Sequence, residues 1–150
     1  MKRSYIKEIK AGEKVLLKGW AFEMRSLSNL AFLVLRDSSG MVQGISKESE
    51  IMKTISNLTL ESVIEITGTV KKAQVKAEFA RKDIEIEIES LIILNRAEKL
   101  PIHVNEKATE PAEISKRLDN RSLDVRKPKV RAIFKIQSTI INGFREYFYN

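Results

Sequence analysis

The chain has 150 residues, 43% of them hydrophobic, which suits one packed domain or a domain with an appended segment. It has no cysteine and one histidine, which excludes disulfides, thiolate zinc sites, cysteine nucleophiles and multi-histidine metal sites. Its 27 basic and 20 acidic residues give a net charge of +7, which favours a polyanionic partner such as nucleic acid. Because no apolar run approaches the ~20 residues of a membrane span, we expect a cytoplasmic protein with no membrane partner.

The first hundred residues predict five strands and one short helix. Apolar and polar residues alternate cleanly along 83–94 and imperfectly along 14–25, residues 30–35 are almost entirely apolar, and the sequences SLSN and DSSG provide turns. Between the third and fourth strands, apolar residues at helical spacing predict a helix over 47–58. The expected strands are residues 14–25, 30–37, 41–46, 62–73 and 83–94. This order is that of the OB-fold, a five-stranded Greek-key barrel that commonly binds single-stranded nucleic acid.

The remaining residues have a different character. Residues 99–127 are rich in charge and proline and show little periodicity, so we expect a hinge or linker there that ends in a charged turn. A helix is predicted to begin at Pro128, because proline is favoured in the first helical turn. The apolar band from Val130 to Phe148 covers so much of this amphipathic helix that we expect a partner to bury it.

Four stretches carry a family resemblance that spans nearly the whole chain. They are GWAFEMR (19–25), AFLVLRDSSGMVQ (31–43), LNRAEKLP (94–101) and RLDNRSLDVRKPKVRAIFKIQS (117–138). With these the chain resembles the N-terminal part of aspartyl-tRNA synthetases of the archaeal and eukaryotic type, with the asparaginyl branch as the nearest competitor. The resemblance implies an anticodon-binding domain over 1–98, a hinge over 99–127 and the first helix of a class II catalytic domain over 128–150.

The resemblance also implies roles for four residues. Phe32 would stack on the central anticodon uridine, Gln43 would help to read that base, Arg25 would help to hold the anticodon, and Glu85 would contact a base edge. Stacking on an aromatic ring and hydrogen bonding to an amide suit a base that is splayed out of its loop. Periodicity alone leaves other interpretations open, in which Phe32 belongs to the core and the three polar side chains are ordinary surface groups.

Basic residues flank the segment between the fourth and fifth strands. They either contact tRNA phosphates or simply keep a loop solvated. These residues are Lys71, Lys72, Lys76, Arg81 and Lys82.

We expect no catalytic residue, metal ligand or cofactor in this chain, because none of the three class II catalytic motifs occurs in it. Its end at Asn150 is expected to mark a fragment or truncated product that is inactive alone. The resemblance implies a longer parent that charges tRNA with aspartate using ATP and magnesium. The implied partners are tRNA, the parent's catalytic domain and a second copy in a homodimer. A stand-alone nucleic-acid-binding OB module, an asparaginyl-tRNA synthetase domain and a purely structural interaction protein stay open as alternatives.

Overall fold

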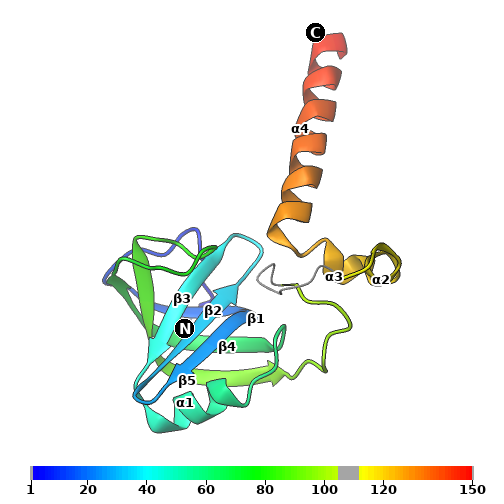
Figure 1. The fold of residues 1–150 in the computed structure, drawn as a ribbon. Coiled ribbons are helices and arrows are strands. Elements are labelled where there is room, and N and C mark those ends of the chain that lie inside the picture. Colours follow the sequence, from blue (N-terminus) through cyan, green and yellow to red (C-terminus); the bar gives the residue numbers. More distant parts are fainter. Residues whose placement is uncertain (1, 105–111, 150) are drawn as a thin grey trace. The chain divides into compact units, whose positions relative to one another are not determined.

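Alternation of apolar and polar side chains lets five strands close into a barrel (Figure 1). The computed structural model describes residues 2–104 and 112–149. The barrel elements are β1 (Lys14–Leu27), β2 (Leu30–Arg36), β3 (Met41–Ser46), α1 (Ser49–Ser56), β4 (Val63–Lys72) and β5 (Ile84–Asn95). Around the barrel the order is β1-β2-β3-β5-β4, with β3 and β5 parallel and the other neighbours antiparallel. The predicted order of five strands with a helix after the third is confirmed.

The barrel interior contains the apolar half of each strand. Leu33 and Leu35 of β2 and Ile86 of β5 are completely buried there. Burying each such side chain contributes about 1.5–3 kcal/mol to folding. The helix α1 lies across one end of the barrel (Figure 1) and adds Ile51 and Ile55 to the same core. The opposite side of each strand is therefore the outer surface of the barrel.

A β-bulge explains why the apolar pattern of β1 is imperfect. The register between β1 and β2 shifts between Ala21 and Glu23, so Phe22 is an extra residue on β1. Ala21 points into the core, while Phe22 is buried on the outside of the barrel. There its ring contacts Phe79 edge to face, with 6.0 Å between ring centroids.

The two charged residues at the end of β2, Arg36 and Asp37, both have structural roles. Arg36 is buried and forms a 2.6 Å ion pair with Glu61, which is buried as well. Asp37 is also buried, and its Oδ1 accepts hydrogen bonds from the backbone N–H groups of Ser39 (2.7 Å) and Gly40 (2.9 Å). The carboxylate thereby fixes the turn into β3. Arg36 and Asp37 thus stabilise the β2–β3 hairpin, which positions the outward side chains of both strands.

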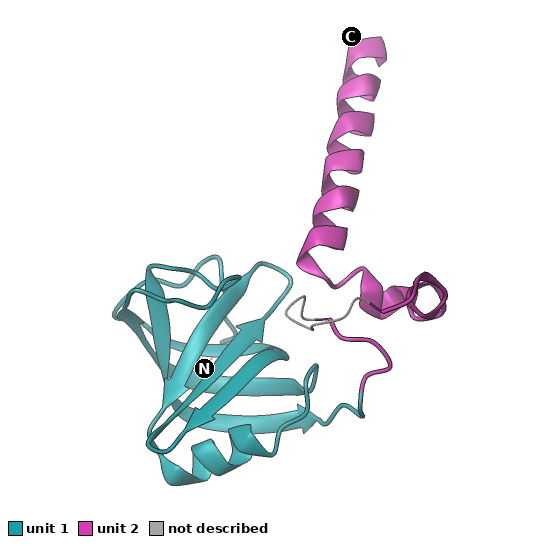
Figure 2. Cartoon of the chain, in the orientation of Figure 1, with its two compact units in different colours: residues 1–99 teal, residues 100–150 magenta. Residues whose placement is uncertain are grey.

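The chain divides into two compact units, Met1–Lys99 and Leu100–Asn150 (Figure 2). The second unit contains three helices among its described residues: α2 (Ile114–Asp119), α3 (Arg121–Asp124) and α4 (Pro128–Tyr149). The helix predicted from Pro128 is present. Within the stretch expected to be a linker and charged turn up to residue 127, the chain forms α2 and α3 rather than irregular structure alone. Residues 105–111 of the expected hinge lie outside the described residues, and its proposed role stays a prediction.

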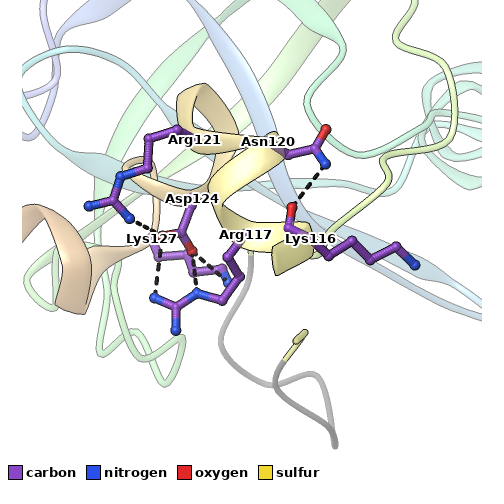
Figure 3. Close-up of polar contacts among 6 residues, drawn as sticks. All are labelled: Lys116, Arg117, Asn120, Arg121, Asp124 and Lys127. Atoms are coloured by element: carbon purple, nitrogen blue, oxygen red, sulfur yellow. Dashed lines mark hydrogen bonds and ion pairs between the residues drawn. The ribbon is translucent and has the colours of Figure 1, made fainter. Parts of the chain in front are cut away.

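A buried carboxylate holds the short helices of the second unit together (Figure 3). Asp124 is completely buried, and it accepts hydrogen bonds from Arg117 Nε (2.9 Å) and Arg121 Nη1 (2.8 Å). Lys127 Nζ lies 3.1 Å from the same carboxylate. The hydrogen bond from Arg117 is the main cause that lowers the pKa of Asp124, and the carboxylate in turn raises the pKa of Arg117. Ion pairing therefore replaces the apolar packing that such short helices lack.

The long helix α4 carries a broad exposed apolar surface. Its exposed apolar side chains are Ile133, Phe134, Ile136, Ile140, Ile141, Phe144, Tyr147 and Phe148. Within residues 2–104 and 112–149, no helix is both long and apolar enough to cross a membrane.

Candidate nucleic-acid interface

A first row of outward side chains crosses β1, β2 and β3. The strand registers place Arg25 opposite Phe32, and Phe32 opposite Ile45. Directly opposite residues in antiparallel strands project on the same side of the sheet. Ala31 and Leu33, which flank Phe32, are completely buried in the core, so Phe32 points outward. Phe32 is half-buried and Arg25 is exposed, which leaves an aromatic ring beside a cation on the barrel surface.

A second row lies beside the first. Val34 is two residues beyond Phe32 on β2, about 7 Å along the strand, and therefore on the same side. The registers pair Val34 with Gln43 on β3, and Gln43 with Glu85 on β5. Gln43 Nε2 donates a 3.2 Å hydrogen bond to Glu85 Oε2, and both side chains are half-buried. The four residues predicted to contact the anticodon thus lie on one outer face.

The connection between β4 and β5 folds back on the barrel next to this face. Val75 and Ala80 are buried, and Phe79 packs on Phe22. The backbone N–H of Arg81 donates a 2.9 Å hydrogen bond to the carbonyl of Met41, two residues before Gln43. The loop is consequently anchored at β3 rather than extended into solvent.

Arg81 ties this loop to the N-terminal segment. Its Nη1 donates to the carbonyl oxygens of Ile6 (3.2 Å) and Ile9 (3.0 Å). Its Nη2 lies 2.7 Å from Asp83, and this hydrogen bond is the main cause that lowers the pKa of the Asp83 carboxyl. A structural role therefore accounts for the position of Arg81, whereas its predicted phosphate contact stays a prediction.

The other basic residues of this region differ in their surroundings. Lys71 forms an ion pair with Glu87 on β5, and Lys82 donates to the backbone carbonyl of Ala77. Two further lysines, Lys72 and Lys76, are exposed. Lys72 also lines an open groove of about 660 Å³ with Lys10 and Arg81. Exposed ammonium groups at the end of β4 and in the β4–β5 loop suit contact with phosphates, and their role stays a prediction.

The side chains of the outer face differ in the chemical groups that they expose. Within the described ranges 2–104 and 112–149, no cluster of three or more histidine or acidic side chains is placed to hold a metal ion. Phe32 offers a ring for stacking, Gln43 offers both a donor and an acceptor, and Arg25 offers a cation for a base or phosphate. The face thus combines a stacking surface, hydrogen-bonding groups and a positive charge.

Comparison with known proteins places the barrel in a family. A family model described as an OB-fold nucleic acid binding domain, of the tRNA anti-codon type, matches residues 15–94. The chain belongs to this family. The predicted OB-fold and the predicted likeness to aspartyl-tRNA synthetases are both confirmed.

Curated relatives and solved structures extend the likeness beyond the OB-fold. The chain is 39% identical over 155 residues to the aspartate–tRNA(Asp/Asn) ligase of Archaeoglobus fulgidus, covering 97% of this chain and 34% of that protein. It is 44% identical over 135 residues to the ligase of the same name from Methanospirillum hungatei, covering 87% and 30%. The crystal structure of asparaginyl-tRNA synthetase from Pyrococcus horikoshii with asparaginyl-adenylate matches with a TM-score of 0.81 and 30% identity, over 98% of this chain and 34% of that chain. The chain therefore spans about a third of these relatives.

Sequence reasoning missed the buried side of the β4–β5 loop. In the sequence, residues 73–80 stand out only through the charges that flank them, yet Phe79 packs on Phe22 and Arg81 joins two backbone segments. The available signal is Phe79 itself, because aromatic side chains are highly buried on average and gain from packing on another ring. Its partner could not be identified, since Phe22 lies at a bulge that alternation does not predict.

Proposed function

We propose that residues 1–98 bind the anticodon loop of tRNA as the N-terminal domain of a longer aspartate–tRNA ligase that acts in the cytoplasm. Membership of the OB-fold family and the names of the curated relatives support this proposal. The observation that carries it is the common outer face of Arg25, Phe32, Gln43 and Glu85.

Recognition follows from the chemistry of that face. Aspartate anticodons have uridine as their central base, and a splayed uridine presents one flat face and one polar edge. The flat face stacks on Phe32, an interaction worth about 1–3 kcal/mol per base. The edge then reaches Gln43 in the neighbouring row, while Arg25 contacts the adjacent base or phosphate. Exposed lysines beside the face add sequence-independent attraction to phosphates.

The charging reaction belongs to the parent enzyme in this proposal. Its catalytic domain would use ATP and magnesium to activate aspartate and transfer it to the 3′ end of the bound tRNA. The exposed apolar surface of α4 would pack within that enzyme, which we propose to be a homodimer.

An asparaginyl parent is the second candidate. The solved asparaginyl-tRNA synthetase from Pyrococcus horikoshii matches this chain at 30% identity over 98% of its length. Aspartate and asparagine anticodons share their first two bases and differ in the third. A face that reads only the central base would therefore accept both.

Fluorescence polarisation with three anticodon stem-loops tests the proposal. The loops carry GUC, GUU or, with the central base changed, GAC, on one identical stem. We expect the GUC loop to bind about 5–150-fold tighter than the GAC loop, as the loss of one well-read base implies. A GUC to GUU affinity ratio far from one would separate the aspartate and asparagine candidates, whereas a ratio near one would show that the face reads only the bases that the two anticodons share. Equal binding of GUC and GAC would support a module without anticodon specificity, and no binding of any loop would support a structural protein.

A further inference from the structure

The hydrogen bond between Gln43 and Glu85 has a defined direction. Nε2 of Gln43 is 3.2 Å from Oε2 of Glu85, and the two residues are register partners on the parallel strands β3 and β5. A carboxylate has no hydrogen to donate, so only the NH2 end of the amide can face it. The carbonyl oxygen Oε1 of Gln43 must then point to the other side of the amide. Neither side chain makes another hydrogen bond within the described part of the chain.

The neighbouring glutamates on the same side of β5 do not share this role. Glu87 pairs with Lys71, and Glu89 lies 2.5 Å from Lys14 and accepts a hydrogen bond from Thr69. Their carboxylates are thus engaged with cations of β1 and β4. Among these three glutamates, Glu85 is the one that accepts a hydrogen bond from an amide, that of Gln43. Gln43 is the residue proposed to contact the central anticodon base.

We propose that Glu85 is a positioning residue that holds the Gln43 amide in the orientation that selects uracil over cytosine. The inference rests on the proposed anticodon function. Uracil has a hydrogen-bond donor at N3, with acceptor oxygens on either side of it. Cytosine has an acceptor at N3 and a donor amino group beside it. An amide held with Oε1 toward N3 attracts the N3–H of uracil and repels the N3 lone pair of cytosine.

Without the carboxylate the amide can rotate by 180° and satisfy either base. The terminal torsion of glutamine has two nearly equivalent arrangements that exchange the oxygen and the nitrogen. A flipped Gln43 would present N–H to N3 of cytosine and lose the repulsion. Selectivity for the central base therefore depends on Glu85 even where Glu85 makes no contact with RNA.

The substitution Glu85→Gln tests this role, because the new amide keeps the size of the side chain but can both donate and accept. Stem-loops with GUC and GCC anticodons are compared by fluorescence polarisation. We expect the GUC to GCC affinity ratio of the wild-type chain to fall at least fivefold in Glu85→Gln, mainly because the GCC loop binds more tightly. Glu87→Gln is the matched control, on the same side of the same strand, and it should leave the ratio unchanged.

A measurement made without RNA separates the positioning role of Glu85 from the proposed anticodon function. In the wild-type chain the NMR signals of the Gln43 NH2 group should show one proton in a hydrogen bond, and Glu85→Gln should change them while Glu87→Gln does not. An unchanged GUC to GCC ratio in Glu85→Gln, or an equal loss of affinity for both loops, would overturn the positioning role. If the wild-type chain bound neither loop, the proposed anticodon function would be contradicted, and the proposed uracil selectivity would be contradicted with it.

Discussion

The backbone N–H of Ile6 donates a 2.9 Å hydrogen bond to Oδ2 of Asp37, 31 residues away in sequence. Both residues are buried, and the other carboxylate oxygen of Asp37 holds the turn between β2 and β3. One side chain therefore joins the N-terminal segment to the hairpin that carries Phe32 and Gln43. The stability of the candidate face depends on a residue that need not touch RNA.

Replacing Asp37 by asparagine should destabilise the barrel. The amide has one acceptor oxygen, so either the Ile6 N–H or the turn N–H groups would lose their partner. A buried donor left without a partner costs about 1–3 kcal/mol. Urea denaturation of Asp37→Asn should show this loss, whereas Glu78→Gln, at an exposed position, should match the wild-type chain within about 0.5 kcal/mol. A wild-type midpoint for Asp37→Asn would contradict the role of this carboxylate.

The ion pairs of Asp124 predict that acid lowers the stability of the second unit. Its pKa is lowered in the folded chain, mainly by the Arg117 hydrogen bond, so its stabilisation is present above the ordinary aspartate pKa of about 3.9. The stabilisation is lost as the pH falls through the folded pKa, below about pH 4. Circular dichroism from pH 6 to pH 2 should show a loss of helix in the wild-type chain that is smaller in Asp124→Asn.

At neutral pH, Asp124→Asn should already reduce the stability of this unit by about 1.5–3 kcal/mol, the range for hydrogen bonds to charged groups. Asp119→Asn provides the control, because Asp119 is an exposed carboxylate in the same helix pair. Identical acid transitions for all three proteins would show that the ion-pair cluster does not stabilise α2 and α3.

Much of the barrel could be predicted because apolar and polar residues alternate along β3, β4 and the first half of β5. The strand 41–46 was predicted with the observed bounds, since Gly40 ends the preceding turn and apolar residues then alternate. Both sides of β2 are apolar, so alternation could not decide which side of β2 faces the core. The resemblance placed Phe32 outward, and the structure agrees because Leu33 and Leu35 fill the interior.

The helices α2 and α3 could not be predicted for a physical reason. They have six and four residues, too few for an apolar period, and an ion-pair cluster around Asp124 stabilises them. The hydrogen bond between Gln43 and Glu85 was equally hidden from the sequence. It depends on the parallel pairing of β3 with β5, which brings together residues 42 positions apart.

The lysines beside the candidate face predict a salt-dependent affinity. Each phosphate contact releases counterions, so replacing Lys72 and Lys76 together by glutamine should lower the slope of log affinity against log salt by about 1–2. Base preference should stay unchanged. Lys47→Gln with Lys53→Gln removes the same charge elsewhere and should keep the slope. Affinity that is independent of salt in the wild-type chain would contradict phosphate contacts by these lysines.

The exposed apolar surface of α4 predicts self-association of this chain. A two-fold pairing would allow identical apolar surfaces to cover each other. Sedimentation velocity of the wild-type chain should show a dimer that Phe144→Asp weakens, because a carboxylate would then lie in the apolar contact. Gln137→Asp adds the same charge at a polar position and should keep the dimer. A wild-type chain that stays monomeric at high concentration would contradict the pairing.

Phe32→Ala gives the most direct test of anticodon binding by the outer face. The ring stacks on the central base in our account, so its removal should weaken binding of the GUC stem-loop by about 1–3 kcal/mol, or 5–150-fold. Ile92→Ala is the control, because Ile92 is another partly exposed apolar residue of the barrel and lies outside the face. The account predicts weak binding by Phe32→Ala and wild-type affinity for Ile92→Ala, with both variants folded by circular dichroism. Equal affinity of Phe32→Ala and the wild-type chain for the GUC loop would contradict it.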